Sequence, residues 1–180
     1  MSAPLIHAAR QLRLIILYSA GWMLLAGCPA PVQQITAADP RPELLRQLDG
    51  AWVMEGTIRD KPVMYNLQVQ STLQGRFSEL HMIDTAFPPQ YEARVFIGYD
   101  SDSRSIYTHW LDLFGAGASV PHGEGYINGD TLLFVVPYPG RPFRDVFVLD
   151  RRQLRWDFLI ESSSDSVQWE QFARYTIRRR

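Results

Sequence analysis

Histidine and carboxylate side chains are the first candidates for chemistry in this sequence. Three histidines, His81, His109 and His122, lie beyond residue 80, and a zinc or iron site needs several such ligands close together. Glu79 and His81 are two residues apart and would share one face of a strand, whereas His109 and Asp112 are three apart and would not. This spacing supplies no complete set of ligands, so we expect no metal site.

Motifs for nucleophilic catalysis and phosphate binding are missing from the sequence. Gly117-Ala118-Ser119 lacks the second glycine of a G-x-S-x-G motif, and no lysine follows Gly115-Ala116-Gly117. The formal net charge of −1 over 180 residues gives no general attraction for nucleic acid. The basic residues Arg178-Arg179-Arg180 are typical of a solvated terminus. We therefore expect neither an enzyme nor a nucleic-acid-binding protein.

The only cysteine, Cys28, follows a segment with the layout of a secretory signal. Arg10 and Arg13 precede an apolar run over 14–26, which is shorter than the roughly twenty residues of a membrane-spanning helix. The run ends in Leu25-Ala26-Gly27-Cys28, which closely resembles the bacterial lipoprotein signal. The resemblance implies that Cys28 is joined to diacylglycerol by a thioether and becomes the new N-terminus.

The same resemblance implies a location. Pro29, rather than an aspartate, follows the cysteine, and this resembles the signal that is passed on to the outer membrane of a Gram-negative cell. The expected partner is therefore the membrane, through the lipid anchor, on the periplasmic face of the outer membrane. The expected organisation is a signal peptide over 1–27, a lipidated N-terminus with a proline-rich tether over 28–42, and one domain over 43–180.

The domain itself has the pattern of an all-β protein. Pro42, Glu43 and three leucines predict a short helix over 42–48, and apolar and polar residues then alternate with a period of two. Turn sequences, of which Asn128-Gly129 is the strongest, separate predicted strands over 52–58, 63–70, 76–83, 91–99, 105–112, 123–127, 131–136, 143–149, 154–160 and 167–177. About ten strands in meander order predict an up-and-down antiparallel β-barrel, because closure leaves no unpaired edge; a two-sheet sandwich is the alternative.

Gly50-Ala51-Trp52, at the start of the first strand, resembles the G-x-W signature of calycins, the superfamily of lipocalins and fatty-acid-binding proteins. In those barrels the tryptophan packs at the closed end, often against an arginine of the last strand. The resemblance therefore implies a structural role for Gly50 and Trp52. It offers Arg174 and Arg178 as the arginine that stacks on the indole, a contact that contributes about 0.5–2 kcal/mol.

Further motifs resemble a bacterial calycin-like family of uncharacterised function. In chain order they are Gly75-Arg76-Phe77, Gly98-Tyr99-Asp100, the segment Trp110 to Gly115, Gly123-Glu124-Gly125 and the basic end Tyr175 to Arg180. The resemblance implies a barrel with an internal cavity and no established activity.

Haem-binding barrels of the nitrobindin type are also similar to this chain. They begin G-x-W-x-G-x-G and carry an axial histidine near the C-terminal strands. Here Met54 stands at the middle glycine, and no histidine follows His122. We therefore expect no haem and no other cofactor.

Large aromatic side chains remain as candidate ligand contacts, because barrels of this kind fill one end with side chains and leave a pocket at the other. We expect Tyr65, Trp110 and Trp156 to line such a pocket. Asp112 shares a strand face with Trp110 and would need a partner there, for which an arginine is expected. The alternative is that Asp112 only caps the turn before Gly115. The expected function is binding or carriage of a small hydrophobic ligand. The alternative is a non-catalytic envelope assembly or interaction factor that uses the barrel surface.

Overall fold

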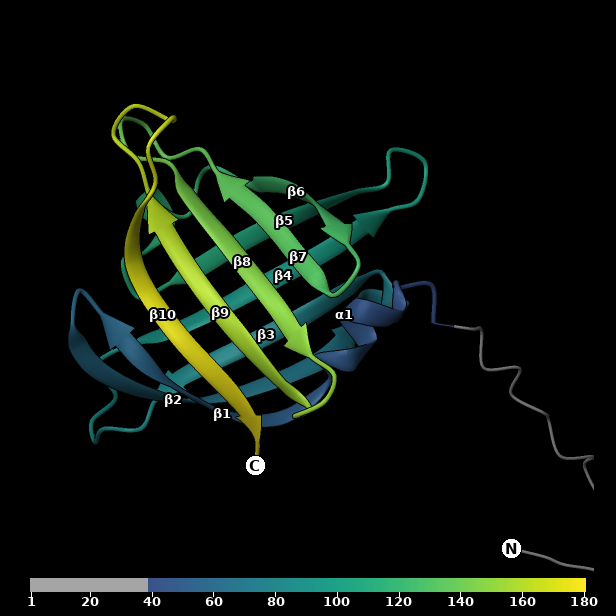
Figure 1. Ribbon diagram of the computed structural model, residues 1–180, viewed down its shortest axis with the longest axis horizontal. Coiled ribbons are helices and arrows are strands. Elements are labelled where there is room, and N and C mark those ends of the chain that lie inside the picture. Colours follow the sequence, from purple (N-terminus) through teal and green to yellow (C-terminus); the bar gives the residue numbers. More distant parts are fainter. Residues whose placement is uncertain (1–38) are drawn as a thin grey trace, which may run out of the picture. The chain divides into compact units, whose positions relative to one another are not determined.

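Residues 39–180, which the computed structural model describes, form a closed antiparallel β-barrel of ten strands (Figure 1). The strands follow one another around the barrel in chain order, and β1 pairs with β10 to close it. The all-β, up-and-down barrel expected from the sequence is confirmed, and the closing pair rules out the two-sheet sandwich. The signal peptide, Cys28 and most of the tether lie outside the described residues.

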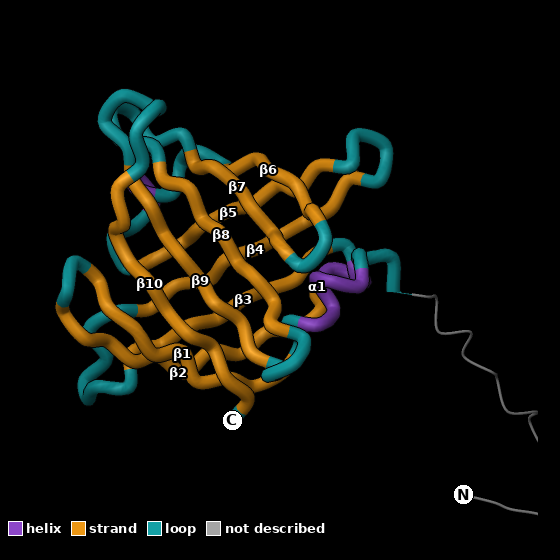
Figure 2. The backbone as a smooth tube through the Cα atoms, in the orientation of Figure 1, coloured by secondary structure: helices purple, strands orange, loops and turns teal. Residues whose placement is uncertain are grey.

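The regular elements follow the predicted order, as the trace in Figure 2 shows. The strands are β1 Gly50–Ile58, β2 Lys61–Thr72, β3 Phe77–Asp84, β4 Glu92–Asp100, β5 Ser105–Asp112, β6 Gly123–Asn128, β7 Thr131–Val136, β8 Phe143–Asp150, β9 Arg155–Ser162 and β10 Glu170–Arg179. The helices are α1 Glu43–Gln47 and the 3₁₀ turns η1 Leu73–Gly75 and η2 Ala116–Ala118. Within residues 39–180, no helix combines the length and the apolar character needed to span a membrane.

Local turn chemistry decides where the strands end. Between β1 and β2, Arg59 and Asp60 both have positive φ, 45° and 66°, as in the type I′ hairpin turn whose twist matches that of the strands. β10 begins later than the predicted residue 167, because Asp165 Oδ1 accepts hydrogen bonds from the backbone N–H groups of Val167 and Gln168. These bonds hold the segment before β10 in a turn.

The segment that precedes β1 closes one end of the barrel. Arg41, only 4% exposed, donates hydrogen bonds to both carboxylate oxygens of Asp49 (2.9 and 2.7 Å) and to Ser78 Oγ of β3 (2.9 Å). The helix α1 that follows packs its apolar side chains into the core, where three leucines are buried: Leu44, Leu45 and Leu48. This end of the barrel is therefore filled with side chains.

Trp52 lies at the same closed end and is only 2% exposed. Its indole N–H donates to the carbonyl oxygen of Leu48 (2.6 Å), and the guanidinium carbon of Arg179 lies 3.9 Å from the ring centroid. The expectation that Arg174 or Arg178 stacks on the indole is therefore wrong. Trp52 is the register partner of Arg179, and alternation along β10 turns Arg174 and Arg178 to the outer surface.

Glycine at the first position of the G-x-W signature has a steric reason in this barrel. Gly50 has a φ of 130°, and a Cβ atom there would collide with the guanidinium group of Arg179. Gly50 therefore leaves room for the arginine that covers Trp52.

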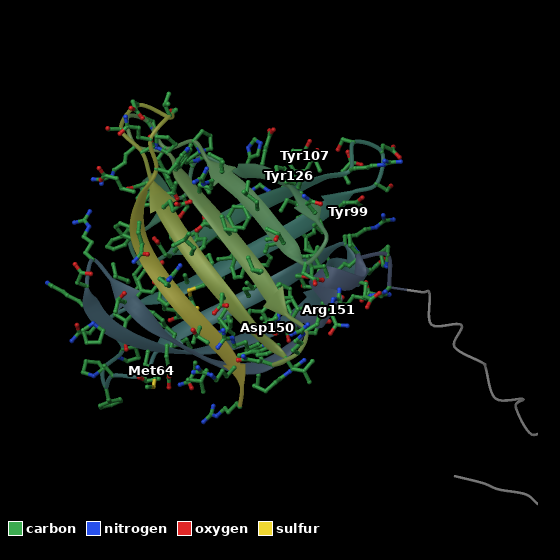
Figure 3. The ribbon with its side chains drawn as sticks, viewed as in Figure 1. Met64, Tyr99, Tyr107, Tyr126, Asp150 and Arg151 are labelled. Atoms are coloured by element: carbon green, nitrogen blue, oxygen red, sulfur yellow. The ribbon has the colours of Figure 1, made fainter. Side chains whose placement is uncertain are left out.

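The outer face of the barrel carries charged pairs and scattered large side chains. Figure 3 labels Met64 and Tyr126, two large residues exposed on this face. It also labels Arg151 in the β8–β9 turn, whose guanidinium lies 2.6 Å from the carboxylate of Asp130 in the β6–β7 turn. Both faces of the strands thus follow the period-two pattern, with apolar residues inside and polar residues mostly outside.

Candidate functional site

A cavity of about 380 Å³ lies in the half of the barrel away from α1. Its volume falls in the range of small-molecule pockets. Its walls come from the ends of the odd-numbered strands, the starts of β8 and β10 and the connections beside them. Half of the lining residues are aromatic: Tyr91, Trp110, Phe114, Tyr138, Phe143, Phe158, Phe172 and Tyr175. The expected pocket opposite the closed end is thus present.

Three polar groups form a hydrogen-bonded chain in the wall of this cavity. The indole N–H of Trp110 donates to the hydroxyl oxygen of Tyr91 (3.1 Å), and that hydroxyl donates to Asp112 Oδ2 (3.2 Å). Burial is the main reason why the pKa of Tyr91 is raised, so this phenol remains a donor at neutral pH. The chain fixes the orientation of the Trp110 ring, which β5 turns toward the interior together with Asp112.

Asp112 is satisfied by different partners from the one expected. Its Oδ2 accepts the hydrogen bond of Tyr91, and its Oδ1 accepts the backbone N–H of Phe114 (3.0 Å). The expectation of an arginine partner is therefore wrong. Asp112 both lines the cavity and caps the turn that leaves β5, because a strand end places its side chain within reach of the next backbone amides.

Asp145 is the functional candidate that the sequence analysis missed. It lies on β8, lines the cavity, and is only 2% exposed. Burial raises the pKa of its carboxyl group to about 8, far above the ordinary value. A signal was present in the sequence, since Asp145 shares a period-two face with the apolar residues Phe143, Phe147 and Leu149.

Tyr65 and Trp156, the other two expected ligand contacts, are core residues outside the cavity lining. Tyr65 packs edge-on behind the lining, with ring centroids 5.8 Å from Tyr91 and 6.1 Å from Tyr175. Trp156 is fully buried and pairs in register with Leu149. Of the expected contacts, the structure brings together Trp110 and Asp112 and adds Tyr91 and Asp145.

The three histidines in the described part of the chain lie away from the cavity. His81 Nε2 lies 2.7 Å from Glu92 Oε1, and the rings of His109 and His122 are 6.0 Å apart on the outside of the barrel. In the part of the chain that the structure describes, no three His, Cys, Asp or Glu side chains are grouped to hold a metal ion. The cavity lining of this described part includes no histidine, so it does not offer the axial ligand of nitrobindin-type haem barrels.

The fold and the cavity define the class: a closed antiparallel barrel of ten strands with an internal pocket, consistent with a calycin-like barrel. Searches with the sequence found no family model and no curated protein that matches it. Among solved structures, the crystal structure of Rv2717c from M. tuberculosis is similar, with a TM-score of 0.54 and 10% sequence identity over 77% of this chain and 96% of that chain. At this identity the likeness shows the fold alone, and the resemblance to a particular calycin-like family stays a prediction.

Proposed function

We propose that the protein is a lipid-anchored envelope barrel that binds or carries a small hydrophobic ligand. The observation that supports it best is the cavity of about 380 Å³, which is walled mainly by aromatic and aliphatic side chains. Few polar groups converge on it, and an apolar pocket with a small number of placed polar groups is typical of small-molecule sites.

The edge of the cavity suits the entry of an apolar molecule. Phe114 lines the cavity and is 76% exposed, and Leu113 and Val120 in the same β5–β6 connection are also exposed. Exposed apolar groups beside a pocket mark a surface where a hydrophobic ligand or partner makes contact. The alternative, an assembly factor, would be favoured by a solid barrel, so the cavity supports the ligand-binding proposal over it.

Binding of apolar fluorescent probes tests this proposal. Wild-type protein should bind such a probe saturably, with quenching of tryptophan fluorescence. Trp110→Leu should weaken binding about fivefold, because an aromatic wall contact is worth about 1 kcal/mol. Asp112→Asn should weaken it less, since Asn still accepts the hydrogen bond of Tyr91.

Trp169→Leu is the matched control for this titration. Trp169 lies outside the cavity lining, with the Arg144 guanidinium 4.6 Å from its ring centroid. This variant should bind the probes as wild type does. Failure of wild-type protein to bind any of a broad panel of apolar probes would contradict the proposed function and favour the assembly factor.

Membrane anchoring is expected to depend on Cys28, which lies outside the described residues. Cys28→Ala removes the only thiol that can accept diacylglycerol, so it should abolish labelling by a radioactive or clickable fatty acid. Cell fractionation should then find the variant as an uncleaved precursor or free of the outer membrane. Undiminished lipid labelling of Cys28→Ala would overturn the lipoprotein assignment. It would not contradict ligand binding, which is proposed from the cavity.

A further inference from the structure

The most unusual polar group of the cavity is the carboxyl group of Asp145. β8 turns this side chain inward between its register partners Phe134 on β7 and Ile160 on β9. Its exposed fraction is 2%, and it belongs to the lining of the cavity. The carboxyl group is therefore removed from bulk water but directed at the space that a ligand would fill.

Asp145 is also left without a partner. Within the described residues, its buried Oδ1 atom has no hydrogen-bond partner, whereas both oxygens of Asp112 in the same cavity accept hydrogen bonds. Buried polar atoms are nearly always paired, because leaving one unpaired carries the full cost of its desolvation. An unpaired acceptor in a cavity wall points to a ligand that supplies the missing donor.

The charges around the cavity restrict the nature of that donor. The titratable residues in the lining are two aspartates and three tyrosines: Asp112, Asp145, Tyr91, Tyr138 and Tyr175. No lysine, arginine or histidine from the described part of the chain lines the cavity. A carboxylate ligand would find no cation there, whereas an ammonium group would find an acceptor and make a charge-assisted hydrogen bond, which is about twice as strong as a neutral one.

We propose that the cavity selects apolar molecules that carry a basic amine, and that the amine pairs with the carboxyl group of Asp145. This inference rests on the proposed ligand-binding function and names the class of ligand. Asp112, held by Tyr91 and by the turn at Phe114, keeps its partners, so Asp145 is the carboxyl group that gains one.

Protonation of Asp145 should be coupled to binding. Burial raises its pKa to about 8, and the neighbouring side chains Phe134 and Ile160 carry no charge that would offset this. The other groups that titrate around the cavity are Asp112, Tyr91, Tyr138 and Tyr175, and the pKa values of these tyrosines are raised by burial. Near neutral pH an ammonium ligand should therefore displace one proton from Asp145 to the solvent.

A matched series of probes tests the inference on the full chain: octylamine, octan-1-ol and octanoate, which share one apolar tail. At a pH slightly above 8, octylamine should bind at least tenfold more tightly than octan-1-ol, and octanoate should bind least. Below pH 8 the affinity for octylamine should fall about tenfold per pH unit, because the amine stays protonated while Asp145 takes up its proton. Calorimetry in two buffers of different ionisation enthalpy should find close to one proton released at neutral pH.

Asp145→Asn is the decisive variant, because it keeps the shape of the side chain and removes the charge. It should keep its affinity for octan-1-ol, which shows that the barrel and its cavity are intact, and lose both the preference for octylamine and the proton release. Asp112→Asn should retain the preference. Equal binding of octylamine and octan-1-ol by wild type, or a preference that survives in Asp145→Asn, would overturn the inference alone. Failure of all three probes to bind would overturn it together with the proposed function.

Discussion

Replacing Trp52 by alanine is expected to lower the free energy of unfolding by about 3–5 kcal/mol, the usual cost of truncating a core aromatic side chain. The indole is 2% exposed, donates its N–H to Leu48 and lies under the guanidinium of Arg179. Its removal leaves a cavity at the closed end and deprives the Leu48 carbonyl oxygen of the hydrogen bond from the indole N–H. Urea unfolding followed by circular dichroism measures the loss.

Two arginines of β10 provide the controls for this prediction. Arg179→Ala removes the group over the indole and should cost about 0.5–1 kcal/mol, as expected of a cation–π contact at an exposed site. Arg178→Ala, one residue away on the outer face, should change the free energy of unfolding by less than that, because its contact with Glu55 is a surface ion pair. A loss below about 1 kcal/mol for Trp52→Ala would show that Trp52 is not a core residue.

The second large effect is expected in the pH dependence of stability, through Asp145. Its pKa of about 8 in the folded chain compares with about 3.9 for an unfolded aspartate. Between these two values the folded chain holds a proton that the unfolded chain has released, so the free energy of unfolding falls as the pH rises. One such group contributes a slope of at most about 1.4 kcal/mol per pH unit, which begins above about pH 4 and ends above about pH 8.

Asp145→Asn removes the titrating group and should remove this slope. In urea unfolding between about pH 5 and about pH 9, the free energy of unfolding of the variant relative to that of wild type should increase with rising pH, by several kcal/mol in all. This difference should become constant above the folded pKa. Asp157→Asn on β9 is the control, because the Asp157 carboxylate is half exposed. The free energy of unfolding of this variant should change with pH as that of wild type does. A difference between wild type and Asp145→Asn that stays constant with pH would contradict the prediction.

Most of the barrel follows from local sequence signals. Alternation of apolar and polar residues predicts all ten strands in order, and Asn128-Gly129 marks the β6–β7 hairpin, where Gly129 has a φ of 56°. The arginine over Trp52 was misassigned, although alternation along β10 places Arg179 on the same face as Tyr175 and Ile177 and turns Arg174 and Arg178 to the other face. What the local pattern does not specify is the register of β10 against β1, which places Arg179 opposite Trp52.

The site was predictable only in part, for a similar reason. Trp110 and Asp112 were found because they share a face of one strand, which is a local property. Tyr65 and Trp156 face the interior as expected, but their distance from the cavity depends on how the barrel is filled from its closed end. The raised pKa of Asp145 arises from its burial among Phe134, Ile160 and their neighbours on other strands. The break that Asp145 makes in the apolar pattern of β8 is visible in the sequence. Its burial in the cavity wall depends on residues of other strands, which the local pattern does not identify.

Closure of the barrel by β1 and β10 also shapes the route by which the chain folds. All strand pairs except β1–β10 join strands that are neighbours in the sequence, and these hairpins close short loops. The pair that contains Trp52 and Arg179 closes a loop that spans almost the whole domain, so its ordering carries the largest loss of chain entropy. Without that pair, the meander would have two unpaired edges, β1 and β10, to which a strand of another chain could add.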